Sequence, residues 1–420
     1  MSSHSAREGD APDHVLIVTG GVGAGHDGAA AELRARLERA GLRAEVRDFL
    51  DAVPWFCRLV LCKGYTGSVR YAPALFEWVF QGVERGTWVN RVVDGMCRVA
   101  QRRVGRWAEG FPVVVSTYPL ASQSLGQLRR TGRLDATVVT YLTDPAVHRL
   151  WVHSDVDHHV TVTEATAAMG TREFGVPMRA VGGLVSPTFE QEHTAAQRIA
   201  TRRAVGLPVD RRVALLVAGS EGMGEVVPTV DAIVASGVAD VLVLCGRNEQ
   251  LRRQLSGRDR VVALGWRSDV ATLMAASDVL VHNAGGLSLT EALTAGLPAV
   301  TFRPIPAHGR ANAELLARAG LVPWPQDDAE LAAAIVSQCE AGRQDRRVVL
   351  RDQDAGLLVR SLLDRDESLL SSAEQTPAYK PARNPVMLAT GHSSQARPTA
   401  LKLTAFNPRR GHRTRSSRIS

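Results

Sequence analysis

Short apolar runs alternate with stretches of helical periodicity along most of the chain. Residues 15–19 are apolar, a glycine cluster follows, and residues 29–40 have the spacing of a helix that Gly41 closes. This order predicts a strand, a glycine loop and a helix. Further short runs rich in β-forming residues cover 42–46, 112–116, 136–141 and 159–162.

The same opening recurs in the second half of the chain. Residues 213–217 are apolar, 219–224 form a glycine-rich turn and 226–236 have helical spacing. Further strand-like runs cover 241–245, 261–264, 279–281 and 299–302. Strands separated by helices indicate parallel sheets, so we expect two α/β units joined by a linker around residues 186–200, with ligands at the carboxyl ends of the strands.

The net charge of +7 belongs to the C-terminal tail. Residues 375–420 contain nine Lys and Arg and no Asp or Glu, so the remaining chain is close to neutral and has no dedicated nucleic-acid-binding surface. Large apolar residues are too sparse there for a core, which predicts a disordered tail over 366–420 and a disordered N-terminus over 1–13. No apolar stretch approaches the roughly 18 residues of a membrane span, and the N-terminus does not resemble a signal peptide. We therefore expect a cytoplasmic protein.

The sequence contains no convincing motif for metal binding or redox chemistry. The five cysteines form no CxxC or Cys/His cluster with zinc spacing, which favours reduced thiols. Asp155 and Asp157 form a D-x-D, which holds a metal in some transferases, but so short a motif is weak evidence. We expect neither a metal nor a cofactor.

The first glycine loop, residues 20–26, follows a strand and precedes a helix. Its amides and the positive helix end suit an anion or a polar substrate. A dinucleotide fingerprint would need a third glycine where His26 or Asp27 stands, so an NAD-dependent enzyme is disfavoured. His26, placed on this loop, suits a proton acceptor near neutral pH or, equally, a residue that caps the helix.

The second glycine segment is the most informative part of the chain. A predicted buried strand ends at Asn283, Gly285 and Gly286 permit close backbone approach, and Ser288 is predicted to begin a helix whose end suits a diphosphate. The carboxylate of Glu291 has the capacity to accept hydrogen bonds from both hydroxyls of a ribose. However, S-x-x-E is also a capping box, so the sequence leaves both roles of Glu291 open.

Four ordered motifs carry a family resemblance. The chain resembles the monogalactosyldiacylglycerol synthases and processive diacylglycerol glucosyltransferases, which are related to the GlcNAc transferase of lipid II synthesis, over roughly residues 14–340. The family's G-x-G-x-G-H loop is matched by Gly21, Gly23, Gly25 and His26, its T-D-x-x-x-H-x-x-W element by Thr143, Asp144, His148 and Trp151, and its G-G-x-[ST]-x-x-E segment by Gly285, Gly286, Ser288 and Glu291. The fourth motif is a proline-rich segment that ends at Asn312, in which Ala307, His308 and Gly309 replace the family's Gly-Gln-Glu.

The resemblance implies a GT-B fold, an α/β architecture of two Rossmann-like domains facing across a cleft. It implies an acceptor-binding domain over 14–190 and a nucleotide-sugar-binding domain over 191–365. His26 would be the base, with Asp144 as a second candidate or as its orienting partner. The expected acceptor-side residues are Gly23, Gly25, His148 and Trp151. The expected donor-side residues are Gly219, Gly246, Asn248, Trp266, Arg267, Asn283, Gly285, Gly286, Ser288, Glu291, His308 and Asn312.

The predicted function is that of an inverting glycosyltransferase that moves a hexose from a UDP-sugar to a lipid such as diacylglycerol. The aromatic and basic residues mixed over 54–88 suit either an interfacial surface or a helical core, and the lipid acceptor of the family favours peripheral contact with an anionic membrane at the inner face of the cell membrane. The alternatives are a GlcNAc transferase with a polyprenyl-linked or other acceptor, a UDP-GlcNAc 2-epimerase-like isomerase, and a non-catalytic nucleotide-binding module.

Overall fold

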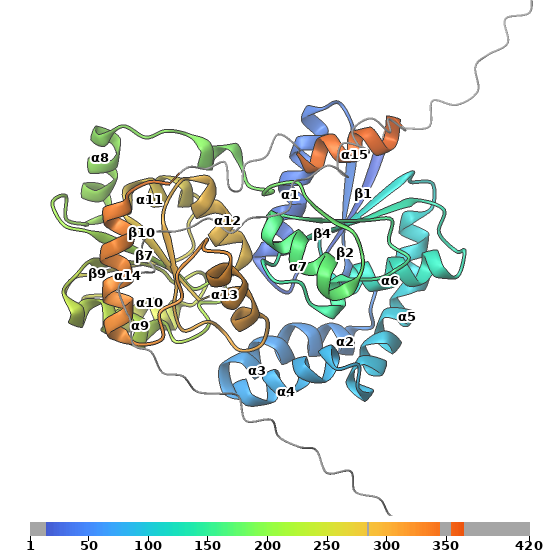
Figure 1. Ribbon diagram of the computed structural model, residues 1–420, viewed down its shortest axis with the longest axis horizontal. Helices are drawn as coiled ribbons and strands as arrows, with labels where there is room; N and C mark the ends of the chain where they lie inside the picture. The colour runs from blue at the N-terminus through green and yellow to red at the C-terminus, as the bar shows by residue number, and fades with distance from the viewer. Residues whose placement is uncertain (1–13, 284, 345–353, 365–420) are drawn as a thin grey trace, which may run out of the picture. The chain divides into compact units, whose positions relative to one another are not determined.

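The computed structural model describes residues 14–283, 285–344 and 354–364 (Figure 1). Both termini that were predicted to be disordered, 1–13 and 366–420, lie outside these ranges. Within them, no helix combines the length and the apolar character that a membrane span requires.

The first sheet has six parallel strands in the order β2-β1-β3-β4-β5-β6. They are β1 His14–Thr19, β2 Arg43–Asp48, β3 Val113–Ser116, β4 Thr137–Leu142, β5 His158–Thr161 and β6 Met178–Ala180. Val15 of β1 lies opposite Ala44 of β2 and Val113 of β3. Because the strand order reverses at β1, the loops after β1 and β3 flank the crevice where ligands of such sheets usually bind.

The second sheet has five parallel strands in the order β11-β10-β7-β8-β9. They are β7 Val213–Val217, β8 Asp240–Leu244, β9 Val261–Leu264, β10 Val279–His282 and β11 Ala299–Thr301. Its order reverses between β7 and β10, so the glycine-rich turn after β7 and the glycine segment after β10 share one crevice. The predicted α/β fold with two Rossmann-like sheets is confirmed.

The helices cover both sheets. In the first half they are α1 Ala24–Arg39, α2 Trp55–Leu59, α3 Tyr65–Tyr71, α4 Pro73–Glu84, α5 Trp88–Ala108, α6 Pro119–Arg130 and α7 Glu164–Phe174, with the short turns η1 Phe49–Asp51, η2 Val60–Gly64, η3 Arg149–Trp151 and η4 Pro187–Glu190. The later helices are α8 Ala195–Val205, α9 Val226–Ser236, α10 Glu249–Leu255, α11 Val270–Ala276, α12 Gly286–Thr294, α13 His308–Arg318, α14 Asp328–Ala341 and α15 Ala355–Asp364.

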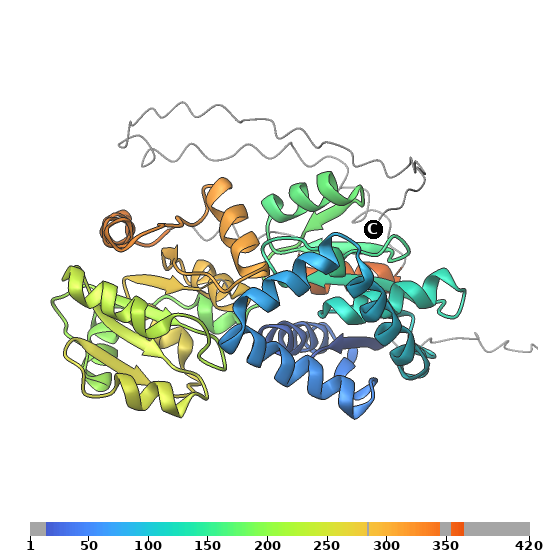
Figure 2. The ribbon, with the colours of Figure 1, turned by 90° about the horizontal axis from the view of Figure 1, so that it is seen from below.

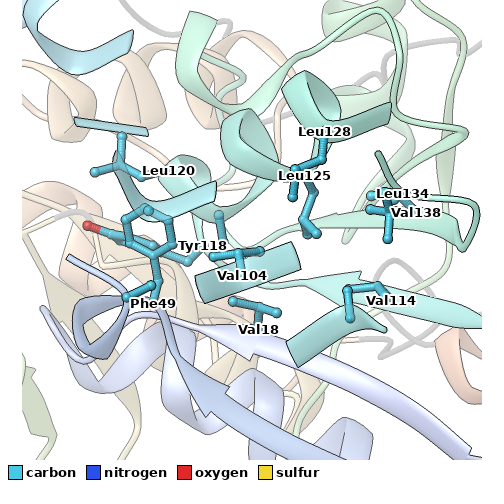
Figure 3. Close-up of a cluster of buried hydrophobic side chains, with 14 of the residues drawn as sticks. Val18, Phe49, Val104, Val114, Tyr118, Leu120, Leu125, Leu128, Leu134 and Val138 are labelled. Atoms are coloured by element: carbon cyan, nitrogen blue, oxygen red, sulfur yellow. The ribbon is translucent and has the colours of Figure 1, made fainter. Parts of the chain in front are cut away.

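One face of the first sheet is sealed by α5 and α6 (Figure 3). Val18, Val114 and Val138 project from three adjacent strands against Val104 of α5 and Leu125 of α6, and all five are buried. Burial of each such side chain contributes roughly 1.5–3 kcal/mol, so this core fixes the carboxyl ends of β1, β3 and β4 rigidly. Those strand ends carry the candidate site.

The chain returns to the first half at its end. Leu358 and Val359 of α15 are buried in the core that Val15 and Leu33 also form. Arg36 of α1 contacts the two segments by which the chain passes between its halves. Its guanidinium donates at 3.0 Å to the carbonyls of Gly183 and Val185, after β6, and pairs with Asp354, just before α15. The division at residues 190 and 365 stays a prediction, but residues 355–364 pack with the first half.

The predicted linker around 186–200 is partly helical. The turn η4 falls within it, and α8 begins at Ala195 behind a complete capping box formed by Thr194 and Gln197. A Thr followed three residues later by Gln is the sequence signature of such a box. Local capping therefore orders a stretch that its composition suggested was a connection.

Candidate active site

His26 lies in the first turn of α1 and not on the preceding loop. The helix begins at Ala24 with Gly23 as its N-cap, because three small residues let the chain turn immediately after β1. Nδ1 of His26 is 2.8 Å from the carbonyl oxygen of Thr117, which follows β3. A carbonyl only accepts hydrogen bonds, so Nδ1 carries the proton and Nε2 keeps its lone pair. Burial lowers the pKa of His26, against the opposing charge of Asp144.

Asp144 follows β4 and remains charged. Nε1 of the fully buried Trp151 donates to Oδ2 of Asp144 at 2.9 Å, and Nε2 of His148 lies 3.6 Å from the same oxygen. Burial alone would raise the pKa of this carboxyl, but the contact with His148 and the charges of His308 and His26 outweigh it and lower the pKa. A carboxylate with a lowered pKa is a poor proton acceptor at neutral pH, so the geometry favours His26 as the base.

Three histidines from distant parts of the chain surround Asp144 electrostatically. His26 and His148 come from the first half, whereas His308 begins α13 in the second half. Nδ1 of His148 is buried and has no hydrogen-bond partner among the described residues. His308 packs against the rings of Phe76 and Phe80, and burial lowers its pKa. The cluster therefore places three imidazoles, drawn from both halves of the chain, around one carboxylate.

The second glycine segment meets the first half at this cluster. Helix α12 begins at Gly286, with Gly285 as the N-cap and no side-chain cap. A Cβ at Gly286 would overlap the carbonyl oxygen of Thr143, the neighbour of Asp144. On α1, a Cβ at Gly28 would overlap the side chain of Leu287, whereas a Cβ at Gly25 would make ordinary van der Waals contact with it. The glycines thus let the N-termini of α1 and α12 approach each other closely.

Glu291 does not cap its helix. Ser288 was predicted to begin the helix, but it lies in the first turn and makes no capping hydrogen bond, so the capping-box alternative is not observed. Desolvation raises the pKa of Glu291 to about 8, and its carboxyl has no hydrogen-bond partner within the described part of the chain. A desolvated carboxyl without a protein partner is typical of a group that a ligand satisfies.

Asn283 and the glycine turn after β7 form one surface. Nδ2 of Asn283 donates to the carbonyl of Met223 at 2.7 Å, next to Gly224. At the end of β8, Gly246 has a φ of 60°, and a Cβ there would overlap the carbonyl of Ser220 and lie 2.6 Å from that of Gly219. These contacts hold the turn against the ends of β7 and β8, with backbone exposed where a diphosphate would lie.

Several predicted donor residues have structural roles. Asn248 accepts from the amide of Leu251 at 2.9 Å and so caps α10. Arg267 pairs through two nitrogens with Asp269, whereas Trp266 is 54% exposed beneath the guanidinium of Arg247, 4.3 Å from its ring centroid. An exposed ring at a strand end suits base stacking, so Trp266 remains a candidate for the base pocket. Arg267 remains a prediction, with its side chain paired to Asp269 at the surface.

Two other groups are explained by packing. Asn312 is fully buried and its Oδ1 accepts from the amide of Ala146 at 2.8 Å, so it connects the two halves. Asp155 pairs with Arg130 at 2.9 Å, and Asp157 pairs with Arg129 at 2.6 Å and accepts from the amide of Val138. The D-x-D carboxylates are therefore occupied by arginines and a backbone amide.

The sequence interpretation missed Thr117, which fixes the tautomer of His26. It gave Thr143 no role, although Oγ1 of Thr143 lies 3.1 Å from Nδ1 of His26. Both threonines follow strands at the carboxyl edge of the first sheet, beside the loop that precedes His26. Their position at strand ends was a usable signal, because parallel strands bring such residues together.

Comparison with known proteins relates each half of the chain to glycosyltransferases. The family described as monogalactosyldiacylglycerol (MGDG) synthase matches residues 26–179, and the family described as glycosyl transferases group 1 matches residues 213–340. Among solved structures, the fold resembles sucrose-phosphate synthase from Thermosynechococcus elongatus, with a TM-score of 0.52 and 15% identity over 86% of this chain and 100% of the other. The glycosyltransferase SnogD from Streptomyces nogalater gives a TM-score of 0.51 and 15% identity over 84% of this chain and 99% of the other.

The fold and the site together define a GT-B glycosyltransferase. Named relatives include processive diacylglycerol beta-glucosyltransferases from Bacillus mycoides, 23% identical, and Bacillus cereus, 22% identical, each over 89% of this chain and 97% of the relative. The first half of the chain thus resembles the MGDG synthases, the second half resembles the group 1 glycosyl transferases, and the whole chain is similar to the processive diacylglycerol beta-glucosyltransferases.

Proposed function

We propose that the protein is an inverting glycosyltransferase that moves a hexose from a UDP-sugar to a lipid hydroxyl such as that of diacylglycerol. The observation that carries the proposal is the fixed tautomer of His26, which leaves Nε2 unprotonated on α1, the helix whose Gly28 packs against Leu287 of α12. The names of the relatives supply the acceptor class. Their β linkage is what inversion of an α-linked UDP-glucose would produce.

The mechanism divides between the two halves. Nε2 of His26 takes the proton of the acceptor hydroxyl as its oxygen attacks the anomeric carbon, and the bond from that carbon to the diphosphate breaks. Asp144, held by Trp151, stabilises the imidazolium that forms. The amides and dipole at the start of α12 stabilise the leaving diphosphate.

Glu291 fits the ribose. Its carboxyl lies on the helix whose N-terminus would bind the diphosphate, and two ribose hydroxyls would satisfy both of its oxygens. Across the second sheet, Trp266 offers an exposed face for the uracil ring. These assignments leave the sugar facing His308, which stands where the family pattern has glutamine, so we expect His308 to contribute to the choice of donor sugar.

The helices α2 to α5 offer a surface for the lipid bilayer (Figure 2). Most of the exposed large apolar side chains among the described residues lie here, including Trp55 at 77%, Trp78 at 53% and Trp88 at 59% exposure. Arg91 and Arg98 of α5 are exposed and have no acidic partner in the described part of the chain. Exposed aromatic rings with unpaired arginines fit an anionic membrane surface, which supports peripheral binding at the inner face of the cell membrane.

A donor and acceptor screen tests the proposal. The purified protein is incubated with UDP-glucose, UDP-galactose or UDP-GlcNAc and vesicles that contain dioleoylglycerol, and the lipids are analysed by mass spectrometry and NMR. We expect a β-linked hexosyl diacylglycerol. Transfer of GlcNAc only to a polyprenyl-linked acceptor, supplied in a parallel incubation, would favour the GlcNAc transferase, and conversion of UDP-GlcNAc to UDP-ManNAc without acceptor would favour the epimerase.

A further inference from the structure

Helix α4 has two distinct faces. Leu75, Trp78 and Val79 are exposed, whereas Phe76 and Phe80 turn inward. The spacing follows the helical period, so one face is available to a partner while the other packs within the protein. The outward face belongs to the surface proposed above for the membrane.

The inward face contacts the second half of the chain through Glu77. Its Oε2 accepts from the backbone amide of Ala307 at 2.6 Å, and its Oε1 accepts from the side chain of Gln81 at 3.0 Å. Ala307 directly precedes His308 and has a φ of 64°, a conformation that residues other than glycine adopt only when their surroundings impose it. Glu77 supplies one such restraint.

The same face also holds the first half of the site. Phe80 lies 6.3 Å from the ring of His308 and 5.5 Å from the ring of His148, measured between centroids. One turn further on, Oε1 of Glu84 accepts from the amide of Arg149 at 2.9 Å. The inward face of α4 therefore contacts the two histidines that approach Asp144 from opposite halves of the chain.

We propose that Glu77 is a positioning residue that couples the lipid surface to the donor side of the active site. When the outward face of α4 is seated in a bilayer, the helix is held in place, and Glu77 then holds Ala307 and His308 against the donor. The rate of transfer is therefore higher when the protein is bound to the membrane that contains the lipid acceptor. This inference rests on the proposed function, since it requires a lipid acceptor and a membrane-facing α4.

The experiment compares transfer from the UDP-sugar to dioleoylglycerol in phosphatidylcholine–phosphatidylglycerol vesicles with transfer to monomeric dihexanoylglycerol, using the full chain. For the native protein we expect a higher kcat/KM on vesicles. Glu77→Ala should bind vesicles normally in cosedimentation but lose the stimulation, with a donor KM raised about tenfold on vesicles. Glu77→Gln keeps an acceptor oxygen for the amide of Ala307 and should restore most of the stimulation.

Two matched variants isolate the coupling. Gln81→Ala removes the other partner of the Glu77 carboxylate and should keep the stimulation. Trp78→Ala, on the outward face, should weaken vesicle binding and leave transfer to the monomeric acceptor unchanged. The inference is overturned if Glu77→Ala is stimulated as the native protein is, or if its vesicle binding, its affinity for the donor and its transfer to the monomeric acceptor are all reduced in parallel. Absence of transfer to either acceptor by the native protein would instead overturn the proposed function.

Discussion

The starts of α1 and α12 are built alike but differ in charge. Each helix follows a glycine segment at the end of a parallel strand, and neither has a side-chain cap. In the first turn of α1, the carboxylate of Asp27 accepts from the hydroxyl of Thr19 at 2.9 Å and offsets the positive charge of the helix end. Asp27 directly follows His26, whose ring is held by the carbonyl of Thr117. The first turn of α12 has no acidic residue. The same local structure thus suits proton transfer at α1 and an anion at α12.

The largest expected effect is a loss of turnover when the histidine at the start of α1 is removed. His26→Ala removes the unprotonated Nε2, so turnover should fall roughly 100-fold or more, the usual worth of a positioned base. The affinity for UDP should barely change, because UDP is expected at α12. Turnover and calorimetric UDP affinity are measured on the same folded preparation. His193→Ala serves as the control, because this half-buried histidine lies in the loop before α8, where its ring contacts the carbonyl of Gln191. Near-normal turnover of His26→Ala would remove His26 from the mechanism.

The next effect is a loss of stability when the close contact between the start of α12 and the end of β4 is disturbed. In Gly286→Ala the new Cβ meets the carbonyl of Thr143, which belongs to the backbone and has little freedom to move. Such overpacking costs about 1–3 kcal/mol, which should appear as a lower midpoint of thermal unfolding and reduced activity. Gly285→Ala is the matched control, since a Cβ there meets nothing within 4 Å and its φ is −69°. Equal stability of the two variants would show that the contact is loose.

A third prediction concerns charge at α12. The pKa of Glu291 is raised to about 8 by burial, so its carboxyl is largely neutral at pH 7, whereas accepting from two ribose hydroxyls requires the ionised form. UDP should therefore bind about tenfold more tightly at pH 9 than at pH 7, because ligand binding favours the deprotonated group. Calorimetry measures this difference, and Glu291→Gln should abolish it. A pH-independent affinity in the native protein would contradict the ribose assignment.

The smallest effect is a shift in the pH profile of kcat/KM for the acceptor, measured at a UDP-sugar concentration that saturates the enzyme at every pH. Burial lowers the pKa of His26 from 6.5, and the active form is the unprotonated one. Activity should therefore persist below pH 6.5 and be lost as the pH falls through the lowered value. Asp144 opposes this shift, so Asp144→Asn should move the acidic limb to still lower pH. An acidic limb above pH 6.5 in the native protein would argue against His26 as the titrating group.

The local parts of the fold were predictable because hydrophobic period and turn chemistry are local properties. The predicted helix at 226–236 and strand at 261–264 coincide with α9 and β9. The helix after the first glycine loop was predicted to begin later than it does, since its first turn, residues 24–27, consists of small and polar residues and carries no apolar pattern. For that reason His26 was placed on a loop.

The contacts between the halves could not be predicted in this way. Glu77 and Ala307 are 230 residues apart, and neither belongs to a periodic pattern that would bring them together. The role of Asn312 was missed for the same reason: its motif indicates a ligand, whereas its side chain bonds to Ala146. Pairings of this kind depend on how two separately predictable sheets meet.

The return of α15 to the first core has a consequence for synthesis on the ribosome. The core around Val15 and Leu33 lacks Leu358 and Val359 until almost the whole chain has emerged, whereas the strands of the second sheet are all made by Thr301. At about 5–20 residues per second, many seconds pass between the synthesis of β1 and that of α15. The half that is translated first is therefore the last to be completed.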